Sequence, residues 1–264
     1  MNDVTLQLPA RWREYFKERQ LTPIRTGMNR TRVWRLVSAT VETDLFLKVA
    51  ESGSTPHLRS EANRTKLLSS QNIRVPTIID ELYDRELAAI VMTALPGIPA
   101  DDASAAAYVP YVATALRQLH SLDVKTCPFD ETTEVRLQRA HGDIERGEID
   151  GSHFDARNAH LTPTPLLQRL SSQVPATHKN DDLVVVHGDA WLSNMISDNS
   201  GEVGFVDCGN SGRGDRYVDL AVVIESLTDV FGEAASKRFL KEYGTHSVLD
   251  ASKLQFFSDL YELF

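Results

Sequence analysis

The order of its patterned segments is the feature that most restricts what this chain can fold into. Runs rich in β-branched and aromatic residues come first, and their alternation and turn residues predict two pairs of strands, at 31–50 and 74–97. Between them, residues 60–70 predict a helix with Ser60 as its N-cap. Apolar residues at helical spacing dominate from residue 98 onward. A sheet followed by helices is typical of α+β proteins.

The chain is expected to form two lobes. Pro96–Gly97 and the small residues that follow interrupt the pattern, so the predicted boundary separates a lobe of residues 1–97 from a lobe of residues 98–264. A chain of 264 residues is long enough for two such lobes. The helices predicted in the second lobe cover residues 108–122, 132–147, 164–172, 216–229, 233–243 and 252–263.

Composition and charge narrow the class of protein. The chain has no apolar run of membrane-spanning length, and its first residues lack the apolar core of a signal peptide, so we expect a cytoplasmic protein with no membrane partner. Two cysteines cannot build a disulfide framework. The net charge of −9 repels nucleic acid phosphates and would suit a cationic substrate. We therefore expect no nucleic-acid partner; the expected assembly is a monomer or a weak dimer.

The stretch "VVVHGDAWLSNMI", residues 184–196, places polar side chains on a short loop between two apolar segments. Its β-branched residues predict a buried strand, and Asp189 and Asn194 follow closely. A second apolar stretch ends at Asp207. Phosphoryl transfer needs a carboxylate that accepts the proton of the attacking hydroxyl, and oxygen ligands that hold magnesium on the phosphates. Asp189 is the candidate base, and Asn194 and Asp207 are the candidate magnesium ligands.

A purely structural interpretation of these residues stays open. Asp and Asn in loops usually bond to their own backbone as turn formers, and for Asp189 alone that interpretation is the better one. The triplet His187-Gly188-Asp189 is a weak signal by itself. Together with Asn194 and Asp207 at these spacings, it favours a catalytic site. For His187, a buried structural role is expected under both interpretations.

Two segments carry a resemblance to a known family. "VVHGDAWLSNMI" and "GFVDCGNSGRGDRYVDLA" resemble the signature of the aminoglycoside phosphotransferases, antibiotic-resistance kinases related to protein kinases, and most of all the 3′-phosphotransferases. "LRQLHSLDVKTCPF" and the C-terminal "KLQFFSDLYELF" resemble the same family. The resemblance implies a bilobal protein-kinase-like fold, with a small antiparallel β-sheet and one helix in the first lobe and a larger, mainly helical second lobe.

The resemblance also implies roles for individual residues. Asp189 would be the catalytic base, and Asn194 and Asp207 would bind Mg²⁺. His187 would brace the loop, and Asp219 would hold loop backbone amides. ATP is the implied phosphoryl donor, and GTP is not excluded.

The first lobe has candidates for nucleotide binding. A kinase needs a lysine on its third strand that reaches the phosphates, paired with a glutamate on the next helix. Lys48 lies among apolar residues, where an unpaired charge is costly, and Glu61 opens the predicted helix. An exposed lysine on an edge strand is the alternative. Phe46 shares a face of the strand with Lys48 and could stack on adenine, although core packing explains it nearly as well.

Two further segments match the family by position. "TGMNRTRVWRL" lies where the resembling kinases have a phosphate-binding loop, although it contains a single glycine. There, backbone amides and small polar residues such as Asn29 and Thr31 are expected to face the phosphates. "VMTALPG" matches the family's hinge, where backbone groups near Thr93 and Leu95 would bind the adenine edge.

The acceptor site is expected to be acidic. Aminoglycosides are polycations, so sites that bind them collect carboxylates. The resemblance points to Asp155 and His153 in "EIDGSHFDARNAH", residues 148–160, which we name the acceptor loop. It also points to Glu262 and Phe264, including the terminal carboxylate of the chain.

The chain departs from the family pattern at four positions. His153 and Ala156 stand where members commonly carry acidic or amide groups. Tyr261 replaces the usual aspartate, and Asn210 replaces a common arginine. These departures leave the kinase residues intact and leave the antibiotic spectrum open.

Three functions remain open from the sequence. The first is ATP-dependent phosphorylation of an aminoglycoside antibiotic, at its 3′-hydroxyl, which confers resistance. The second is another small-molecule kinase of this fold, since "MTALPGIPADDAS" is similar to streptomycin 3″-kinases, whereas the "ELF" ending is not. The third is a catalytically silent, kinase-like binding module. The joint presence of Lys48, Asp189, Asn194 and Asp207 argues against silence.

Overall fold

The structure is a computed structural model that describes residues 8–24, 31–40, 43–51, 55–84, 87–177, 183–244 and 249–264. Its residues divide by their contacts into two units. The first unit comprises Met1–Ser69 and Pro76–Leu95, and the second comprises Ser70–Val75 and Pro96–Phe264. The first unit therefore ends at Leu95, two residues before the predicted end of the first lobe.

The short segment Ser70–Val75 joins the second unit although it precedes the boundary. The carbonyl of Arg74 accepts the N–H of Phe205 at 2.8 Å, and its guanidinium pairs with Asp198 at 2.8 Å. Its Nη2 also donates to the carbonyl of Pro96 at 2.9 Å. No local sequence pattern predicts these bonds, because all three partners are distant from Arg74 in the sequence.

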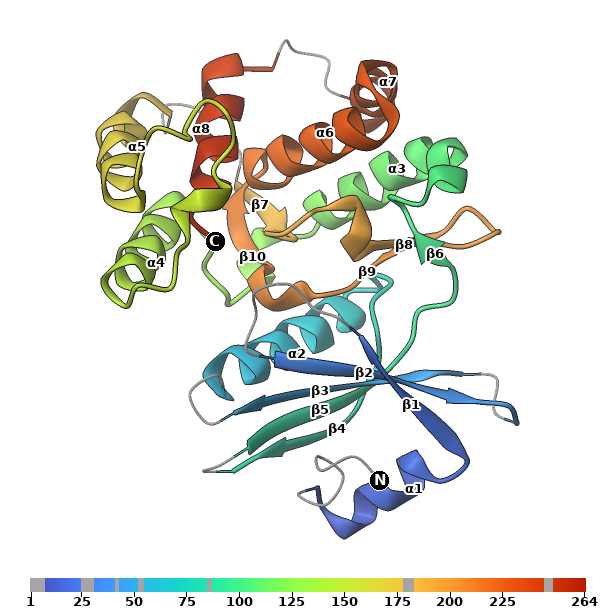
Figure 1. The fold of residues 1–264 in the computed structure, drawn as a ribbon. Helices are drawn as coiled ribbons and strands as arrows, with labels where there is room; N and C mark the ends of the chain where they lie inside the picture. The colour runs from blue at the N-terminus through green and yellow to red at the C-terminus, as the bar shows by residue number, and fades with distance from the viewer. Residues whose placement is uncertain are drawn as a thin grey trace. The chain divides into compact units, whose positions relative to one another are not determined.

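The first unit is a five-stranded antiparallel sheet with one long helix (Figure 1). The strands lie in the order β1-β2-β3-β5-β4, so β3 is central and its lysine is not on an edge. The elements are α1 (Arg13–Phe16), β1 (Arg19–Ile24), β2 (Thr31–Ser38), β3 (Leu45–Glu51), α2 (Thr55–Ser70), β4 (Ile78–Tyr83) and β5 (Leu87–Thr93). The strand pairs predicted at 31–50 and 74–97 are confirmed.

The two faces of the sheet pack against different partners. On one face, Leu47 joins an apolar cluster that includes Trp12. On the other face, Ala50 joins a cluster that includes Leu58 of α2, and α2 lies along this face in Figure 1. Side chains alternate along a strand, so Lys48 shares its face with Ala50 and points to the side that α2 covers.

Strand β1 (Arg19–Ile24) was not predicted. It is an edge strand, and most of its side chains are exposed. It also contains Pro23, which lowers the strand signal because proline cannot donate to a ladder of hydrogen bonds. An edge strand with little burial leaves little periodicity to detect.

Helix α2 begins at Thr55, so the prediction of Ser60 as its N-cap is wrong. Ser60 lies inside the helix, and its Oγ accepts a hydrogen bond from Arg64 Nε at 3.0 Å. Pro56 is the start signal that was overlooked, since proline is well suited to the first turn. Glu61 therefore lies inside the helix and does not open it.

The second unit is mainly helical and contains two small sheets. Its helices are α3 (Val109–His120), α4 (Thr133–Glu145), α5 (Pro163–Thr177), α6 (Tyr217–Phe231), α7 (Glu233–Tyr243) and α8 (Ala251–Tyr261). Its strands are β6 (Ile98–Pro99), β7 (Leu183–Val186), β8 (Met195–Ser197), β9 (Val203–Phe205) and β10 (Gly212–Asp215). All six helices predicted for the second lobe are present, with ends shifted by a few residues.

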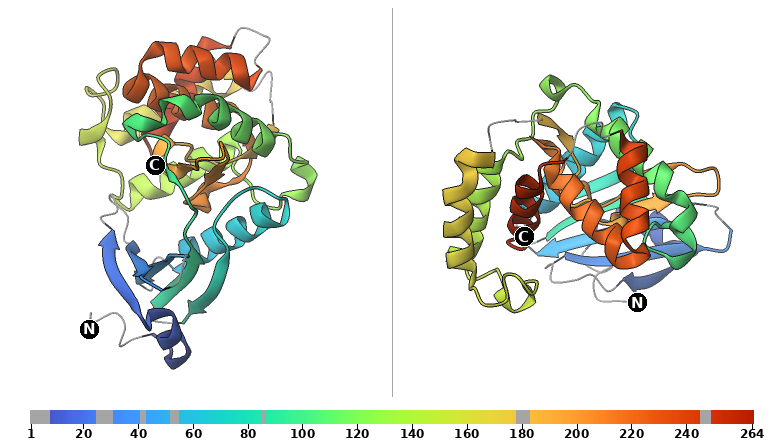
Figure 2. Two further views of the ribbon diagram at one scale, coloured as in Figure 1. Left: turned by 90° about the vertical axis from the view of Figure 1, so that its right-hand side faces the viewer. Right: turned by 90° about the horizontal axis from the view of Figure 1, so that it is seen from above.

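Helix α8 is docked in the core of the second unit. Phe257, Leu260 and Leu263 are buried in one apolar cluster with Leu166 of α5 and Val186 of β7. Helix α5 packs against both α8 and α4 (Figure 2). Docking holds the end of the chain in place, as the helical spacing of these apolar residues predicted.

The strands of the second unit position the loop that the sequence singled out. Strand β7 ends at Val186, directly before His187, and β8 begins at Met195, directly after Asn194. Strands β8 and β9 pair as a hairpin, and Asp207 follows two residues after β9 ends at Phe205. In the described part of the chain, none of the helices has the length and apolarity needed to cross a membrane.

Candidate active site

A buried carboxylate holds the loop of residues 187–194. Asp219, in the first turn of α6, accepts the N–H of His187 at 2.7 Å and that of Gly188 at 2.8 Å. Nε2 of His120 lies 2.9 Å from the same carboxylate. Burial raises the pKa of Asp219, but its bonds with His120 and the loop outweigh burial, so the pKa lies below its ordinary value. The predicted role of Asp219 in holding loop amides is confirmed.

His187 also holds the loop, through hydrogen bonds of both nitrogens of its ring. Its Nδ1 accepts the N–H of Asp189 at 3.3 Å, so Nε2 carries the proton and donates to the carbonyl of Val206 at 3.0 Å. Gly188 has a φ of 84°, and a Cβ there would lie 2.1 Å from the carbonyl oxygen of Asn210. A glycine is therefore required at this position. The loop presents Asp189 on a backbone that is bonded on both sides.

The side chain of Asp189 is held by two donors. Its Oδ1 accepts the hydroxyl of Tyr261 at 2.5 Å, and its Oδ2 accepts Nδ2 of Asn194 at 2.9 Å. The same Nδ2 donates to the carbonyl of Asp189 at 3.0 Å. The carboxylate is only partly buried, so a substrate hydroxyl can reach it.

Asn194 and Asp207 lie at the ends of neighbouring strands. The N–H of Val206 donates to the carbonyl of Asn194 at 2.9 Å, which places Asp207 one residue from that bond. Asp207 has a φ of 60° and a ψ of 47°, a left-handed conformation that aspartate adopts more readily than most residues. Its side chain is exposed.

The donor chemistry of this pair fits a magnesium ion. The amide nitrogen of Asn194 is turned to Asp189, which leaves the amide oxygen as the group that can bind a cation. Asp207 supplies a carboxylate, and Mg²⁺ prefers a few hard oxygen ligands that phosphate oxygens and waters complete. A carboxamide oxygen and a carboxylate therefore suit magnesium held on a nucleotide.

In the first unit, Lys48 and Glu61 form an ion pair. Nζ of Lys48 lies 2.5 Å from Oε1 of Glu61, and the two side chains are only 13% and 11% exposed. Strand β3 and helix α2 thus carry the pair that the sequence predicted. Phe46, on the same face, is partly buried and packs against the cluster beneath α2, so both interpretations of this residue stay open.

The predicted hinge residues lie at the end of β5. The N–H of Thr93 donates to the carbonyl of Thr77 at 3.0 Å, and its hydroxyl accepts the N–H of Thr77 at 2.9 Å. These bonds occupy the amide of Thr93, so its carbonyl and the backbone of Leu95 are the groups that could meet adenine. Asn29 lies outside the described residues.

Two of the predicted acceptor residues lie together. Oε2 of Glu262 accepts the N–H of Asp155 at 2.9 Å, and Oε1 accepts Nδ2 of Asn158 at 2.6 Å. The acceptor loop is thereby bonded to the end of α8. The carboxylate of Asp155 also pairs with Arg157 at 2.5 Å, a contact that reduces the negative charge it offers to a cation.

The other two predicted acceptor residues, His153 and Phe264, have different contacts. His153 is exposed, and its Nε2 lies 3.4 Å from the carboxylate of Asp150 on the same loop. The ring of Phe264 lies beneath two guanidinium groups, those of Arg136 and Arg139. Among the described residues, His153 forms no hydrogen bond or ion pair with Asp155 or Glu262.

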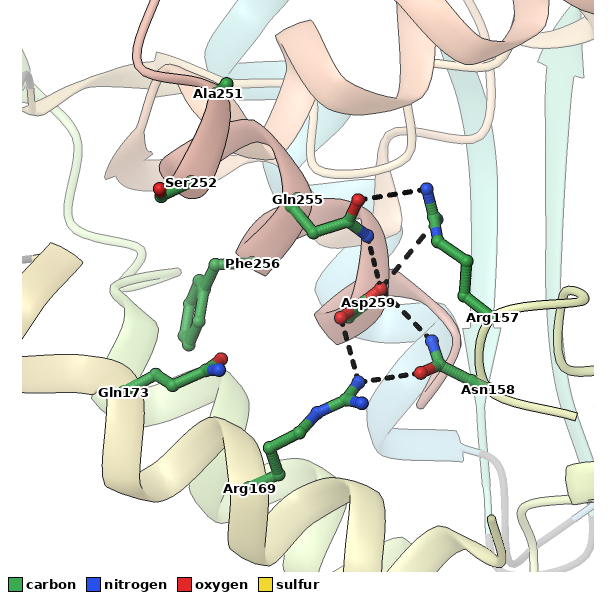
Figure 3. Close-up of a pocket in the computed structure, with 9 residues that line it drawn as sticks. All are labelled: Arg157, Asn158, Arg169, Gln173, Ala251, Ser252, Gln255, Phe256 and Asp259. Carbon is green, nitrogen blue, oxygen red and sulfur yellow. Dashed lines mark hydrogen bonds and ion pairs between the residues drawn. The ribbon is translucent and has the colours of Figure 1, made fainter. Parts of the chain in front are cut away.

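Basic residues surround a further acid near the acceptor loop. Asp259 of α8 is buried and accepts hydrogen bonds from Arg169 at 2.8 Å, Asn158 at 3.1 Å and Gln255 at 2.6 Å, with Arg157 at 3.7 Å (Figure 3). These side chains line a cavity of about 710 Å³. Sequence reasoning missed the two arginines, which neutralise acids in a region expected to be acidic.

Three residues at the 187–194 loop were also missed. Nη2 of the buried Arg136 donates to the carbonyl of Gly188 at 2.5 Å, and Arg139 donates to Oδ1 of Asn210 at 3.1 Å. Arg139 of α4 thus places a guanidinium beside Asn210. Tyr261 was noted only as a departure. For Arg136, the available signal was an arginine at a buried position of the amphipathic helix α4.

Comparisons with known proteins give concordant results. The model of the phosphotransferase enzyme family matches residues 20–257. An aminoglycoside 3′-phosphotransferase of Streptomyces fradiae is 31% identical over 84% of this chain and 87% of its own length. The crystal structure of an aminoglycoside-3′-phosphotransferase of type VIII superposes with a TM-score of 0.86 at 31% identity, covering 96% and 97% of the two chains.

A third similar protein has been solved with a nucleotide and an antibiotic bound. Aminoglycoside phosphotransferase APH(3″)-Id of Streptomyces rimosus, solved in complex with ADP and streptomycin, superposes with a TM-score of 0.84 at 27% identity over 100% of this chain and 99% of its own. These likenesses confirm the predicted α+β, kinase-like fold.

Proposed function

The chain belongs to the phosphotransferase enzyme family, and we propose that it transfers the γ-phosphoryl group of ATP to the 3′-hydroxyl of an aminoglycoside antibiotic, which confers resistance. The observation that carries the proposal is the carboxylate of Asp189, held by two donors beside an oxygen pair suited to magnesium. A cytoplasmic location, where ATP is present, belongs to the same proposal.

Asp189 acts as the base in this proposal. The acceptor hydroxyl oxygen forms a bond to the γ-phosphorus while the bond from that phosphorus to the bridging oxygen of ADP breaks, and the hydroxyl proton passes to Asp189. His187 and Asp219 hold the loop backbone, so the carboxylate needs little reorganisation when the hydroxyl arrives. The products are ADP and the phosphorylated antibiotic.

Asn194 and Asp207 would hold a magnesium ion, which would offset the negative charge that develops on the phosphates. Lys48 would bind the nucleotide phosphates with its ammonium. Its partner Glu61 keeps that ammonium extended from a mostly buried position, where an unpaired charge would be costly.

The first unit would bind the base of the nucleotide through backbone groups. The carbonyl of Thr93 and the N–H of Leu95 are the proposed contacts of the adenine edge, and Phe46 is the proposed stacking partner. Asn29 would face the phosphates. GTP remains an alternative donor, because these contacts involve backbone more than side chains.

The acceptor would be bound through Asp155 and Glu262, with Phe264 as a further candidate. Charge-assisted hydrogen bonds from the antibiotic's ammonium groups would orient it. His153 is a weaker candidate, since its ring pairs with Asp150.

A streptomycin 3″-hydroxyl is the second candidate acceptor. One observation favours it: Arg157 and Arg169 neutralise acids around α8, so the site offers less negative charge than a polycation with many ammonium groups prefers. The similar structure solved with ADP and streptomycin supports this alternative.

A panel of antibiotics tests the proposal. The purified enzyme is given Mg²⁺ and ATP or GTP with kanamycin, with tobramycin, which lacks a 3′-hydroxyl, or with streptomycin, and release of nucleoside diphosphate is measured. We expect turnover with kanamycin and none with tobramycin; ³¹P and ¹H NMR of the product locate the phosphate. Turnover with streptomycin alone would favour the streptomycin 3″-hydroxyl as the acceptor. If no antibiotic is turned over, the catalytically silent binding module would be the remaining function.

The variant Asp189→Ala is the negative control for this assay. It should bind ATP and fold like the wild type, while kcat falls about 10²–10⁴-fold, the range of general-base contributions. A variant that retains most of its kcat would remove Asp189 from the role of base.

A further inference from the structure

Tyr261 makes the shortest contact that Asp189 has with another side chain in the described part of the chain. The hydroxyl of Tyr261 lies 2.5 Å from Oδ1 of Asp189, and the two residues are 72 positions apart. Tyr261 is the last residue of α8, which is docked in the core through Leu260 and Leu263 on either side of it. The phenol is therefore presented by a fixed element.

The phenol is the donor in this hydrogen bond. Burial raises the pKa of Tyr261, and the negative charge of Asp189 raises it further, so the hydroxyl keeps its proton. A phenol that stays protonated donates to the carboxylate and adds no charge of its own.

Tyr261 and Asn194 together determine the orientation of the carboxylate. One donor holds Oδ1 and the other holds Oδ2, and they come from different elements, since Tyr261 ends α8 and Asn194 directly precedes β8. Each carboxylate oxygen has two lone pairs, so one on each oxygen remains for the proton of an acceptor hydroxyl. Rotation of the side chain about χ2 would break both bonds.

The phenol is itself braced by its neighbours. Its ring meets the ring of Trp191 edge to face, with centroids 5.8 Å apart. The next residue, Glu262, accepts bonds from Asp155 and Asn158 of the acceptor loop. The end of α8 is therefore held by the ring of Trp191 and by the acceptor loop. These contacts fix the position of the Tyr261 hydroxyl.

We propose that Tyr261 is a positioning residue for the catalytic base, which holds Asp189 in the rotamer that receives the acceptor proton. This inference rests on the proposed role of Asp189 as base. Tyr261 acts through Asp189 and forms no bond to the phosphoryl group. Removing its hydroxyl should therefore lower kcat and leave the affinity for the nucleotide unchanged.

The test compares two phenylalanine substitutions of tyrosine. Tyr261→Phe removes the hydroxyl from Asp189. Tyr217→Phe is the matched control, because Tyr217 is also buried and its hydroxyl accepts the N–H of Asp250 at the opposite end of α8. We expect kcat of Tyr261→Phe to fall about tenfold, the rate equivalent of one net hydrogen bond to a charged group, with KM for ATP unchanged. The control should keep the wild-type kcat and KM.

A double-mutant cycle separates positioning from general stabilisation. In an Asp189→Ala enzyme the base is absent, so adding Tyr261→Phe should lower the residual turnover no further. A merely structural role would lower turnover equally in both backgrounds. ATP binding measured by calorimetry shows that each variant is folded.

The outcomes distinguish this inference from the proposed function. If Asp189→Ala is inactive and Tyr261→Phe has wild-type kcat, the inference is overturned and the proposed function stands. If Tyr261→Phe lowers turnover by the same factor with and without Asp189, positioning is also refuted. If Asp189→Ala itself keeps most of its kcat, the proposed base is wrong and the inference fails with it.

Discussion

The guanidinium of Arg136 lies over the ring of Phe264, with its Cζ 4.8 Å from the ring centroid. A cation over an aromatic face is attracted by the quadrupole of the ring. The same guanidinium donates from Nη2 to the carbonyl of Gly188 at 2.5 Å. The last residue of the chain therefore covers the arginine that holds the loop carrying Asp189.

The first prediction separates the ring of Phe264 from the terminal carboxylate. Phe264→Ala keeps the carboxylate and removes the ring, so kcat should fall severalfold, by less than the roughly 10²-fold that a misplaced catalytic group can cost. Deleting Phe264 removes the ring and displaces the carboxylate, so KM for the aminoglycoside should also rise, far more than KM for ATP. Steady-state kinetics on both variants measure the two effects. An unchanged aminoglycoside KM in the folded deletion variant would exclude the terminal carboxylate from the site and favour the streptomycin alternative.

The second prediction concerns Lys48. Lys48→Ala removes the ammonium proposed to bind the phosphates, so KM for ATP should rise about tenfold or more. The control is Lys66→Ala, which removes an exposed lysine of α2 that pairs with Glu81. Kinetics at saturating aminoglycoside measure the change. Equal KM values for ATP in both variants would argue against the assignment of Lys48.

The third prediction concerns magnesium. Asp207→Ala should abolish magnesium-dependent turnover, because the carboxylate that would hold the ion on the phosphates is gone. The control is Asp198→Ala, since Asp198 is an acid of the same hairpin that pairs with Arg74 instead. Titration of each variant with Mg²⁺ at fixed ATP is the measurement. A variant of Asp207 that titrates like the wild type would mean that another residue binds the metal.

The fourth prediction concerns Arg157. Its pairing with Asp155 neutralises one of the two proposed acceptor carboxylates, so Arg157→Ala should lower KM for a cationic aminoglycoside about two- to fivefold at low salt, within the range of a partly exposed ion pair. High salt should reduce the gain through screening. Arg146→Ala is the control, because Arg146 is similarly exposed (55% against 51%) and pairs with other acids. A higher KM in Arg157→Ala would mean that Arg157 itself contacts the antibiotic.

The fifth prediction concerns the pH dependence of stability. The pKa of Asp219 lies below its ordinary value, so its contribution is fully present above the unfolded pKa and is lost as the pH falls through the folded one. Asp219→Asn should therefore lower the free energy of unfolding by about 3 kcal/mol at pH 7, and the difference from the wild type should narrow below about pH 4.

Urea unfolding at a series of pH values measures this difference. Asp229→Asn is the control, because Asp229 is an exposed acid of the same helix. A difference between wild type and Asp219→Asn that grows as the pH falls below 4 would contradict the assigned direction of the pKa.

Regular elements could be predicted wherever burial imposes a period on the sequence. The strand pair in residues 31–50 buries apolar side chains at alternate positions, and the helix near 252–263 buries one face, so their apolar residues recur at the matching spacing. Strand β1 and the first turn of α2 escaped prediction. The edge strand is mostly exposed, and the start of α2 was assigned to a serine that proved to lie inside the helix.

Part of the site was predictable because its parts are close along the chain. Asp189 and Asn194 share one loop, and Asp207 follows the hairpin that begins directly after that loop. Strand pairing of β8 with β9 places Asn194 and Asp207 near each other with little freedom. Residue types and spacing were therefore sufficient to propose a base with two oxygen ligands.

The sequence by itself determined which chemical groups the chain offers and where its strands and helices can lie, because both depend on residue type and on periods of a few residues. Only the tertiary structure decided which of those groups meet. Tyr261 reaches Asp189 across 72 residues, and Arg136 reaches Gly188 across 52. Such contacts arise because α4 and α8 bury apolar faces in the second unit, and burial acts on whole faces without regard to distance along the chain.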